Sequence, residues 1–199
     1  MNKFTVTENL FTQDILDNII SKYAKWNSTD KPSDYWPEGA KNKDAIVSVE
    51  PLTDQDQMLL KEYLFTEDIS LFKGFKPIKN ATFMVFKAKP GYILSAHEDY
   101  CIASLTVFID PDATWESGGE FYWVDKLGNK NIVNNHYNTG IQWKSQDNEA
   151  TFNPKHGTLI NNKDRFVMQM FVKEKPNRFD IKSEFKDIAE QELLLGRRW

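Results

Sequence analysis

A chain of 199 residues with 40% hydrophobic and 14% aromatic side chains can bury the core of one globular domain, which excludes an intrinsically disordered protein. The net charge of −4 is mixed along the chain without a basic block, so we expect no nucleic-acid partner. The single cysteine, Cys101, excludes an intrachain disulfide. Neither a signal peptide nor a membrane-spanning run is evident, and we expect a cytoplasmic protein with no membrane partner.

The first eighty residues predict a helical layer. Residues 12–26 have a helical period, with apolar side chains on one face at Ile15, Leu16, Ile19, Ile20 and Tyr23. Thr12 is the expected N-cap of this helix, and Thr53 that of a second helix at residues 53–64. Between them, residues 27–44 have no period and contain prolines and a glycine, which predicts a long loop of the kind that forms lids or binding sites.

The next ninety residues predict a β structure. Short β-branched or aromatic runs alternate with turns, at residues 82–87, 102–109, 120–124, 132–133, 139–143, 158–160 and 165–172. Such a series without intervening helices indicates a sandwich or barrel, including the jelly-roll type. A closing helix is expected at residues 184–195. The fold class is therefore α+β, with residues 1–199 forming one domain: a helical support layer (1–80), a jelly-roll core (81–173) and a C-terminal helix (174–199).

The triplet His97-Glu98-Asp99 is the first candidate site. On an extended strand His97 and Asp99 face the same side, and together they offer one imidazole nitrogen and one carboxylate oxygen to a divalent metal. A His-x-Asp triplet by itself is more often a hydrogen-bonded structural pair. Of the other two histidines, His156 leads into a strand and is the better third ligand, whereas His136 lies in a polar loop.

An arginine begins the last core strand. Arg165 opens a run that otherwise reads as buried on both faces, and an arginine directed into a barrel needs an anion, most naturally a carboxylate held by two hydrogen bonds. Two histidines and one carboxylate leave metal positions open, as in non-haem iron(II) oxygenases.

In its order of motifs the chain resembles the Fe(II)/2-oxoglutarate-dependent dioxygenases, in particular the prolyl 4-hydroxylase-like branch. The resemblance covers about residues 80 to 173 and rests on Pro90-Gly91, His97-Glu98-Asp99, Phe108-Ile109-Asp110, Gly118-Gly119-Glu120-Phe121, Tyr137-Asn138-Thr139, His156 and Arg165. It implies a double-stranded β-helix (jelly-roll or cupin-like) core, with the N-terminal helices packed on one sheet and a C-terminal helix.

The resemblance also implies the chemistry. His97, Asp99 and His156 would be the catalytic metal ligands of Fe(II), and Arg165 would hold the distal carboxylate of 2-oxoglutarate. With O2 as the second cosubstrate, and ascorbate in support, such an enzyme hydroxylates an unactivated C–H bond and converts 2-oxoglutarate to succinate and CO2. The expected substrate is a residue of a peptide or protein, a free amino acid or another small molecule.

Two positions depart from this branch. A tyrosine that bonds the distal carboxylate in close prolyl-hydroxylase relatives corresponds to Phe108, so Thr106 or Thr158 would take its place. A second tyrosine before the Pro-Gly turn corresponds to Lys87 or Ala88.

Two other functions stay open. Phe108 favours a non-catalytic, metal-binding cupin-like module. A metal-dependent hydrolase or isomerase on the same barrel would instead use Arg165 to bind its substrate. The nucleic-acid demethylases are disfavoured, because they carry a second arginine where this chain has Phe171.

Overall fold

The structure is a computed structural model that describes residues 3–27, 30 and 46–173. Its two α-helices, α1 (Gln13–Tyr23) and α2 (Asp54–Thr66), lie where the periodicity predicts them. Thr53 caps α2 as expected, since its hydroxyl accepts a hydrogen bond from the backbone N–H of Asp56 at 3.3 Å. The side chain of Thr12 makes no such bond at the start of α1, so the expected side-chain cap is wrong there.

A six-stranded antiparallel sheet forms the scaffold. Its strands, in spatial order, are β1 (Thr5–Thr7), β9 (Gly140–Lys144), β6 (Ala103–Phe108), β12 (Arg165–Val172), β3 (Ala81–Ala88) and β2 (Val47–Pro51). The two longest strands, β12 and β3, lie side by side near the centre, paired from Arg165 opposite Ala88 to Val172 opposite Ala81. Central strands are covered on both faces, which explains why β12 reads as an almost continuous apolar run.

Two smaller antiparallel sheets complete the strands. The four-stranded sheet has the order β4 (Leu94–His97), β11 (His156–Thr158), β7 (Phe121–Val124) and β8 (Lys130–Val133). The two-stranded sheet pairs β10 (Thr151–Phe152) with β5 (Tyr100–Cys101). Short 3-10 helices are η1 (Lys76–Asn80) and η2 (Trp115–Ser117).

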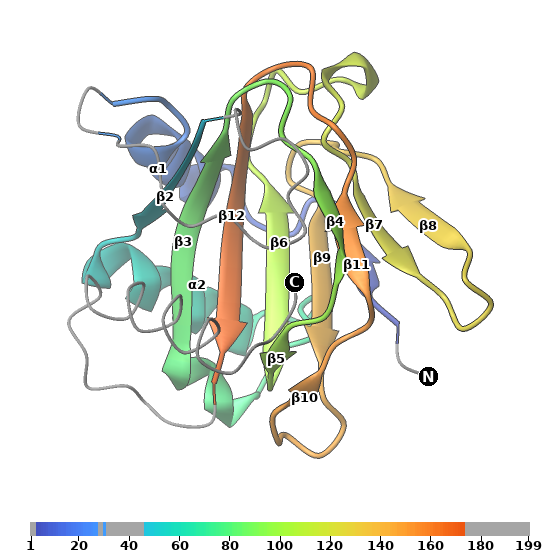
Figure 1. Ribbon diagram of the computed structural model, residues 1–199. Helices are drawn as coiled ribbons and strands as arrows, with labels where there is room; N and C mark the ends of the chain where they lie inside the picture. The colour runs from blue at the N-terminus through green and yellow to red at the C-terminus, as the bar shows by residue number, and fades with distance from the viewer. Residues whose placement is uncertain (1–2, 28–29, 31–45, 174–199) are drawn as a thin grey trace.

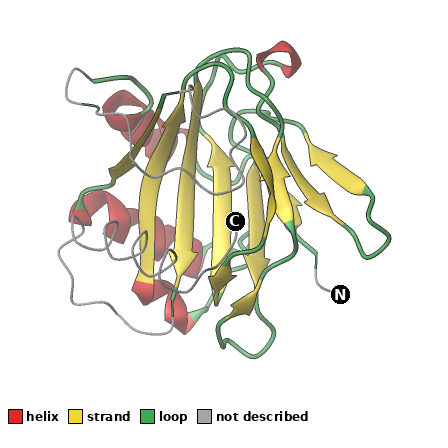
Figure 2. Ribbon diagram, viewed as in Figure 1, coloured by secondary structure: helices red, strands yellow, loops and turns green. Residues whose placement is uncertain are grey.

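Two apolar cores lie on opposite faces of the six-stranded sheet. One joins the helices to it, through residues such as Leu16, Leu60, Val85 and Met168. The other fills the space between the six-stranded and four-stranded sheets, and includes Phe86, Phe108, Phe121, Val133 and Val167. The helices therefore cover one face of the large sheet and the four-stranded sheet covers the other (Figures 1 and 2). This is an antiparallel jelly-roll arrangement with few helices, in line with the predicted fold class.

Some elements differ from the sequence prediction. Strands β1, β2, β4, β5 and β10 were not expected, and β11 begins at His156, two residues before the predicted strand. The expected closing helix at residues 184–195 and most of the expected loop at 27–44 lie outside the described residues. None of the helices that the structure describes combines the length and apolar character needed to cross a membrane.

Candidate metal centre

Two histidines that are 59 positions apart meet on the four-stranded sheet. His97 ends β4, His156 begins β11, and the register of these strands places the two residues directly opposite each other. Their rings lie 4.5 Å apart between centroids. The pairing then shifts between His156 and Thr158, so the sheet is irregular at the site itself.

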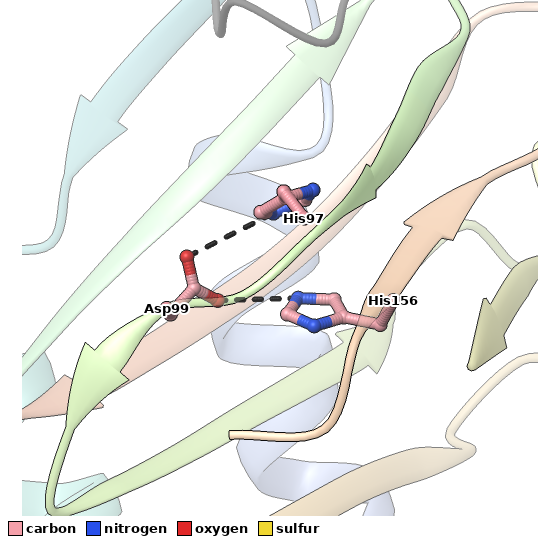
Figure 3. A group of neighbouring side chains, drawn as sticks. All are labelled: His97, Asp99 and His156. Atoms are coloured by element: carbon pink, nitrogen blue, oxygen red, sulfur yellow. Dashed lines mark ion pairs between the residues drawn. The ribbon is translucent and has the colours of Figure 1, made fainter. Parts of the chain in front are cut away.

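Asp99 completes the group, just after β4 (Figure 3). One carboxylate oxygen lies 3.1 Å from Nε2 of His156, and the other lies 3.8 Å from Nε2 of His97. One ligating atom from each residue lies within 4.8 Å of the others, and all three side chains are buried. The structure thus brings together the three residues predicted as a metal site, and the intervening Glu98 is exposed.

Backbone carbonyl groups fix the orientation of both rings. Nδ1 of His97 lies 3.0 Å from the carbonyl oxygen of Ser95, and Nδ1 of His156 lies 2.9 Å from that of Pro154. A carbonyl oxygen only accepts, so each Nδ1 carries the hydrogen and, in a neutral ring, each Nε2 carries the lone pair. Such bonds are the usual support of metal-bound histidines.

The charge states suit a cation. Burial, and then the neighbouring His156, lower the pKa of His97, which keeps its ring neutral near pH 7. For Asp99, burial acts to raise the pKa, but the close contacts with His156, His97 and Asn153 outweigh it and lower the pKa to about 2, so the carboxyl group is ionised near pH 7. Two imidazole lone pairs and an ionised carboxylate therefore converge on one point, which is the donor set of a divalent metal site.

Asn153 is a functional candidate that the sequence did not reveal. It is 1% exposed and holds Asp99 on both sides. Its Oδ1 accepts the backbone N–H of Asp99 at 2.8 Å, and its Nδ2 donates to the Asp99 carboxylate at 3.2 Å. No local pattern marks Asn153, because its partner is 54 positions away.

Aromatic rings support His156 from within the core. Phe121 stacks on it with centroids 5.2 Å apart, and Phe4 meets it edge-on at 5.3 Å. Phe4 reaches this place because β1 pairs with β9 at the edge of the large sheet. One side of the site is therefore lined by the apolar rings of Phe4 and Phe121.

Arg165 lies at the start of β12 with its side chain in the interior between the sheets. It is 7% exposed, and it shares a face of β12 with the core residue Val167. Its Nε donates to the carbonyl oxygen of Gly119 at 2.9 Å. Gly119 has a φ of +78°, and a Cβ on it would lie 2.7 Å from Cδ of Arg165, so only glycine lets the arginine pass.

The Arg165 guanidinium forms no ion pair with an acidic side chain of the described residues. Burial lowers its pKa to about 10, against the opposing effects of Tyr92 and Glu120, so the group is still charged near pH 7. A buried cation without a counter-charge is costly, and a bound anion would remove that cost.

The other predicted site residues are placed as follows. Thr158 shares a face of β11 with His156, and its buried Oγ1 has no hydrogen-bond partner among the described residues. Thr106 shares a face of β6 with Phe108, and it pairs with Gln169 of β12. Neither threonine is hydrogen-bonded to Arg165, whose side-chain bond within the described residues goes to Gly119. His136 is an exposed loop residue away from the group, as expected.

The two departures from the resembling branch are also visible. The Phe108 ring lies 5.8 Å from the Arg165 guanidinium carbon, so the position beside the arginine is apolar. Ala88 faces the interior opposite Arg165, whereas Lys87 faces the other way and pairs with Asp30 at 2.9 Å and Glu50 at 2.6 Å. Lys87 therefore forms structural ion pairs, and Ala88 is the residue that points into the core between the two sheets.

Comparisons with known proteins find similarity in structure and not in sequence. No family model matches the chain, and no curated protein matches it. A prolyl-4-hydroxylase from Pseudomonas putida superposes with a TM-score of 0.61 at 11% identity, covering 88% of this chain and 94% of that one. A prolyl hydroxylase from Trichoplax adhaerens, in complex with a hypoxia inducible factor peptide, gives 0.56 at 9% identity, covering 87% and 84%. HygX from Streptomyces hygroscopicus, with nickel and 2-oxoglutarate bound, gives 0.52 at 10% identity, also covering 87% and 84%. The chain thus has the fold of these three proteins.

Proposed function

We propose that this protein is an iron(II)- and 2-oxoglutarate-dependent oxygenase that hydroxylates an unactivated C–H bond. The observation that carries the proposal is the convergence of His97, Asp99 and His156 in a fold that also buries Arg165, which has no acidic partner in the part of the chain that the structure describes. A metal and a dicarboxylate together would satisfy both features.

In this proposal the metal supplies the oxygen chemistry when it is bound, and the chain supplies position and charge. His97, Asp99 and His156 are the ligands, and Asn153 holds Asp99 in its ligating orientation. Arg165 neutralises the distal carboxylate of 2-oxoglutarate. Thr158, whose buried hydroxyl has no hydrogen-bond partner among the residues that the structure describes, and Thr106 are the other proposed cosubstrate contacts.

The products follow from the stoichiometry. One O2 molecule and one 2-oxoglutarate give succinate and CO2, and one oxygen atom enters the substrate as a hydroxyl group. We propose a residue of a peptide or protein, or a free amino acid, as the substrate of a single-domain enzyme. The support is the structural likeness to two proteins described as prolyl hydroxylases, one of them in complex with a peptide.

The test measures the conversion of 2-oxoglutarate to succinate in the absence of the physiological substrate. Purified protein with Fe(II), ascorbate and 2-oxoglutarate should form succinate slowly in air and none under nitrogen. With Mn(II) in place of Fe(II), 2-oxoglutarate should raise the melting temperature.

The outcomes separate the alternatives. Metal binding without any 2-oxoglutarate effect would favour a non-catalytic metal-binding module, for which Phe108 beside Arg165 is the supporting observation. Oxygen-independent turnover with Zn(II) or Mn(II) would favour a hydrolase or isomerase. If the proposal holds, incubation with peptide libraries or free amino acids should give a product heavier by one oxygen atom.

A further inference from the structure

A row of three side chains extends the metal centre across the four-stranded sheet. Strand β11 lies between β4 and β7 (Figure 1), and His156 of β11 is directly opposite His97 of β4 and Trp123 of β7. Side chains that are directly opposite each other in an antiparallel sheet point to the same face, with Cβ atoms about 5 Å apart. Trp123 therefore points to the same side as the two histidines, one strand away from His156.

Ring contacts agree with this direction of Trp123. The Phe4 ring lies 6.1 Å from the Trp123 ring and 5.3 Å from the His156 ring, between centroids. Phe121 precedes Trp123 by two positions and so shares its face of β7, and it stacks on His156 at 5.2 Å. The indole, the two phenyl rings and the imidazole thus form one aromatic group beside the metal centre.

Exposure distinguishes Trp123 from the two phenylalanines of this group. Phe4 and Phe121 are each 4% exposed, which makes them core residues. Trp123 is only partly buried, although it packs against the same core. Phe4 therefore supports the indole, and part of the indole surface stays accessible beside His156.

An accessible indole beside the metal centre favours one kind of substrate group. In the proposed function the reacting carbon atom carries an unactivated C–H bond, so the group that approaches the metal is itself apolar. Removing the surfaces of such a group and of the indole from water is favourable, and an aromatic ring supplies a large contact area. A charged group in the same place would lose part of its hydration, and the side chains of Phe4 and Phe121 offer it no hydrogen bond in return.

We propose that Trp123 is a substrate-binding residue whose indole holds the apolar group that carries the reacting C–H bond. The substrate is then selected for an aliphatic side chain or a saturated ring, and against a charged side chain. This inference rests on the proposed function, because it takes the metal held by His97, Asp99 and His156 as the point that the substrate must reach.

The test measures which side chains bind beside the metal centre. The probes are the N-acetyl amides of leucine, proline, aspartate and lysine. The lysine probe is included because an indole face also attracts cations. Protein loaded with Zn(II) and 2-oxoglutarate is titrated with each probe, and ligand-observed NMR gives the dissociation constant without turnover. With Fe(II) in place of Zn(II), mass spectrometry detects the addition of one oxygen atom to a probe.

Two variants of Trp123 are compared with a matched control. Trp123→Ala removes the ring, and Trp123→Phe keeps a smaller aromatic ring in its place. Trp115→Ala is the control, because Trp115 is a tryptophan of the short helix η2 that is 76% exposed. Circular dichroism checks the fold of each variant, and Trp123→Phe carries the test if Trp123→Ala does not fold.

The expected result is a preference for apolar probes that depends on the indole. The wild type should bind the leucine or the proline amide at least about fivefold more tightly than the aspartate and lysine amides. Trp123→Ala should weaken the preferred amide about five- to tenfold and change the charged amides less than about twofold, and Trp123→Phe should lie between Trp123→Ala and the wild type. Trp115→Ala should bind all four probes as the wild type does. With Fe(II), the preferred amide should gain one oxygen atom, and its KM should rise more than its kcat falls in Trp123→Ala.

Three outcomes would overturn the inference with the proposed function intact. Equal affinity of the wild type for all four probes would remove the selection for an apolar group. An unchanged preference in both variants would show that Trp123 only packs against Phe4. Preferred binding of the lysine amide, lost in Trp123→Ala, would make the indole a cation site instead. If the wild type with Fe(II) forms no succinate from 2-oxoglutarate, the proposed function falls, and this inference with it.

Discussion

Two buried aspartates, Asp56 and Asp99, differ in their partners. In the completed network the carboxylate is surrounded by hydrogen-bond donors of the chain itself, whereas in the uncompleted one it faces groups that are also acceptors. Asp56 is 2% exposed and Asp99 is 6% exposed, and both pKa values lie below the ordinary range. The partners of Asp56 are all donors: Asn18 at 2.9 Å, Lys22 at 2.7 Å, Tyr23 at 2.7 Å and Thr53 at 2.8 Å. The network around Asp56 is therefore complete within the chain.

Asp99 has different neighbours. Asn153 donates to it, but its other partners are two imidazoles that present Nε2. When both rings are neutral, these nitrogens are acceptors, so the centre becomes complete only with a cation. An aspartate side chain thus stabilises the fold at Asp56, where it joins α1 to α2, and creates a binding site at Asp99, where it faces two histidines.

The largest expected effect is on metal binding at the uncompleted centre. His156→Ala should weaken Mn(II) binding by more than about a hundredfold, because one of three ligands is lost. The affinity is measured by calorimetry on protein whose fold is checked by circular dichroism. His136→Ala is the matched control and should bind Mn(II) within about twofold of the wild type. Similar losses in both variants would remove His156 from the site.

At the completed centre the expected effect is on stability. Asp56→Asn should lower the free energy of unfolding by about 2 kcal/mol, because the charge that several donors share is lost. Urea unfolding measures it, and Mn(II) affinity should be unchanged. Asp54→Asn, at an exposed position of the same helical turn, should cost less than about 1 kcal/mol. Loss of Mn(II) binding in Asp56→Asn would contradict the distinction between the two centres.

The stability that Asp56 contributes should depend on pH. Burial acts to raise its pKa, but the hydrogen bonds from Lys22 and Tyr23 and their neighbours lower it below the value of about 3.9 in an unfolded chain. A carboxyl group whose folded pKa is depressed stabilises the fold above that value, and the contribution is lost as the pH falls. The difference in unfolding free energy between wild type and Asp56→Asn should therefore be largest near pH 7 and shrink below about pH 4. A difference that grows in acid would contradict this assignment.

A substitution of Arg165 should weaken the binding of the cosubstrate and leave the binding of the metal nearly unchanged. Arg165→Met should weaken 2-oxoglutarate binding to the Mn(II)-loaded protein roughly 10- to 100-fold, through loss of charge-assisted hydrogen bonds. Mn(II) affinity without 2-oxoglutarate should stay within about threefold. An equal loss of both affinities would mean that the substitution disturbs the whole core.

The smallest expected effect is at the residue that orients Asp99. Asn153→Ala should weaken Mn(II) binding about tenfold, the lower end of what the loss of a supporting residue costs. Asn134→Ala, an exposed loop position, is the control. An unchanged affinity in Asn153→Ala would show that the backbone bond from Asn153 to Asp99, at 3.0 Å, is enough.

The sequence was a good guide where burial repeats with a clear period. The apolar faces of α1 and α2 and the long strands β6 and β12 could be predicted, because each buries side chains at helical or alternating spacing. Strands β1 and β2 could not, since they are edge strands whose existence depends on pairing with β9 and β3. Strand β4 is short and only partly buried, which leaves no pattern.

The candidate site divides in the same way. His97, Asp99 and His156 could be proposed from residue type and order, because few side chains bind metals. Asn153 could not be found, because asparagine is a common residue and its role depends on a contact with Asp99, which lies 54 positions away. The shift in pairing beside His156 is likewise a tertiary feature. The type of a side chain can be read from the sequence, whereas the direction in which it points depends on the tertiary fold.

The direct pairing of His97 with His156 has a thermodynamic consequence. A metal held there would fasten β4 to β11, and only the folded chain brings these strands together. By mass action, a ligand that binds only the folded state adds about 2.7 kcal/mol of stability at a hundred times its dissociation constant. The free concentration of metal would then set how firmly the four-stranded sheet stays closed, and a chelator would act on the protein as a mild denaturant.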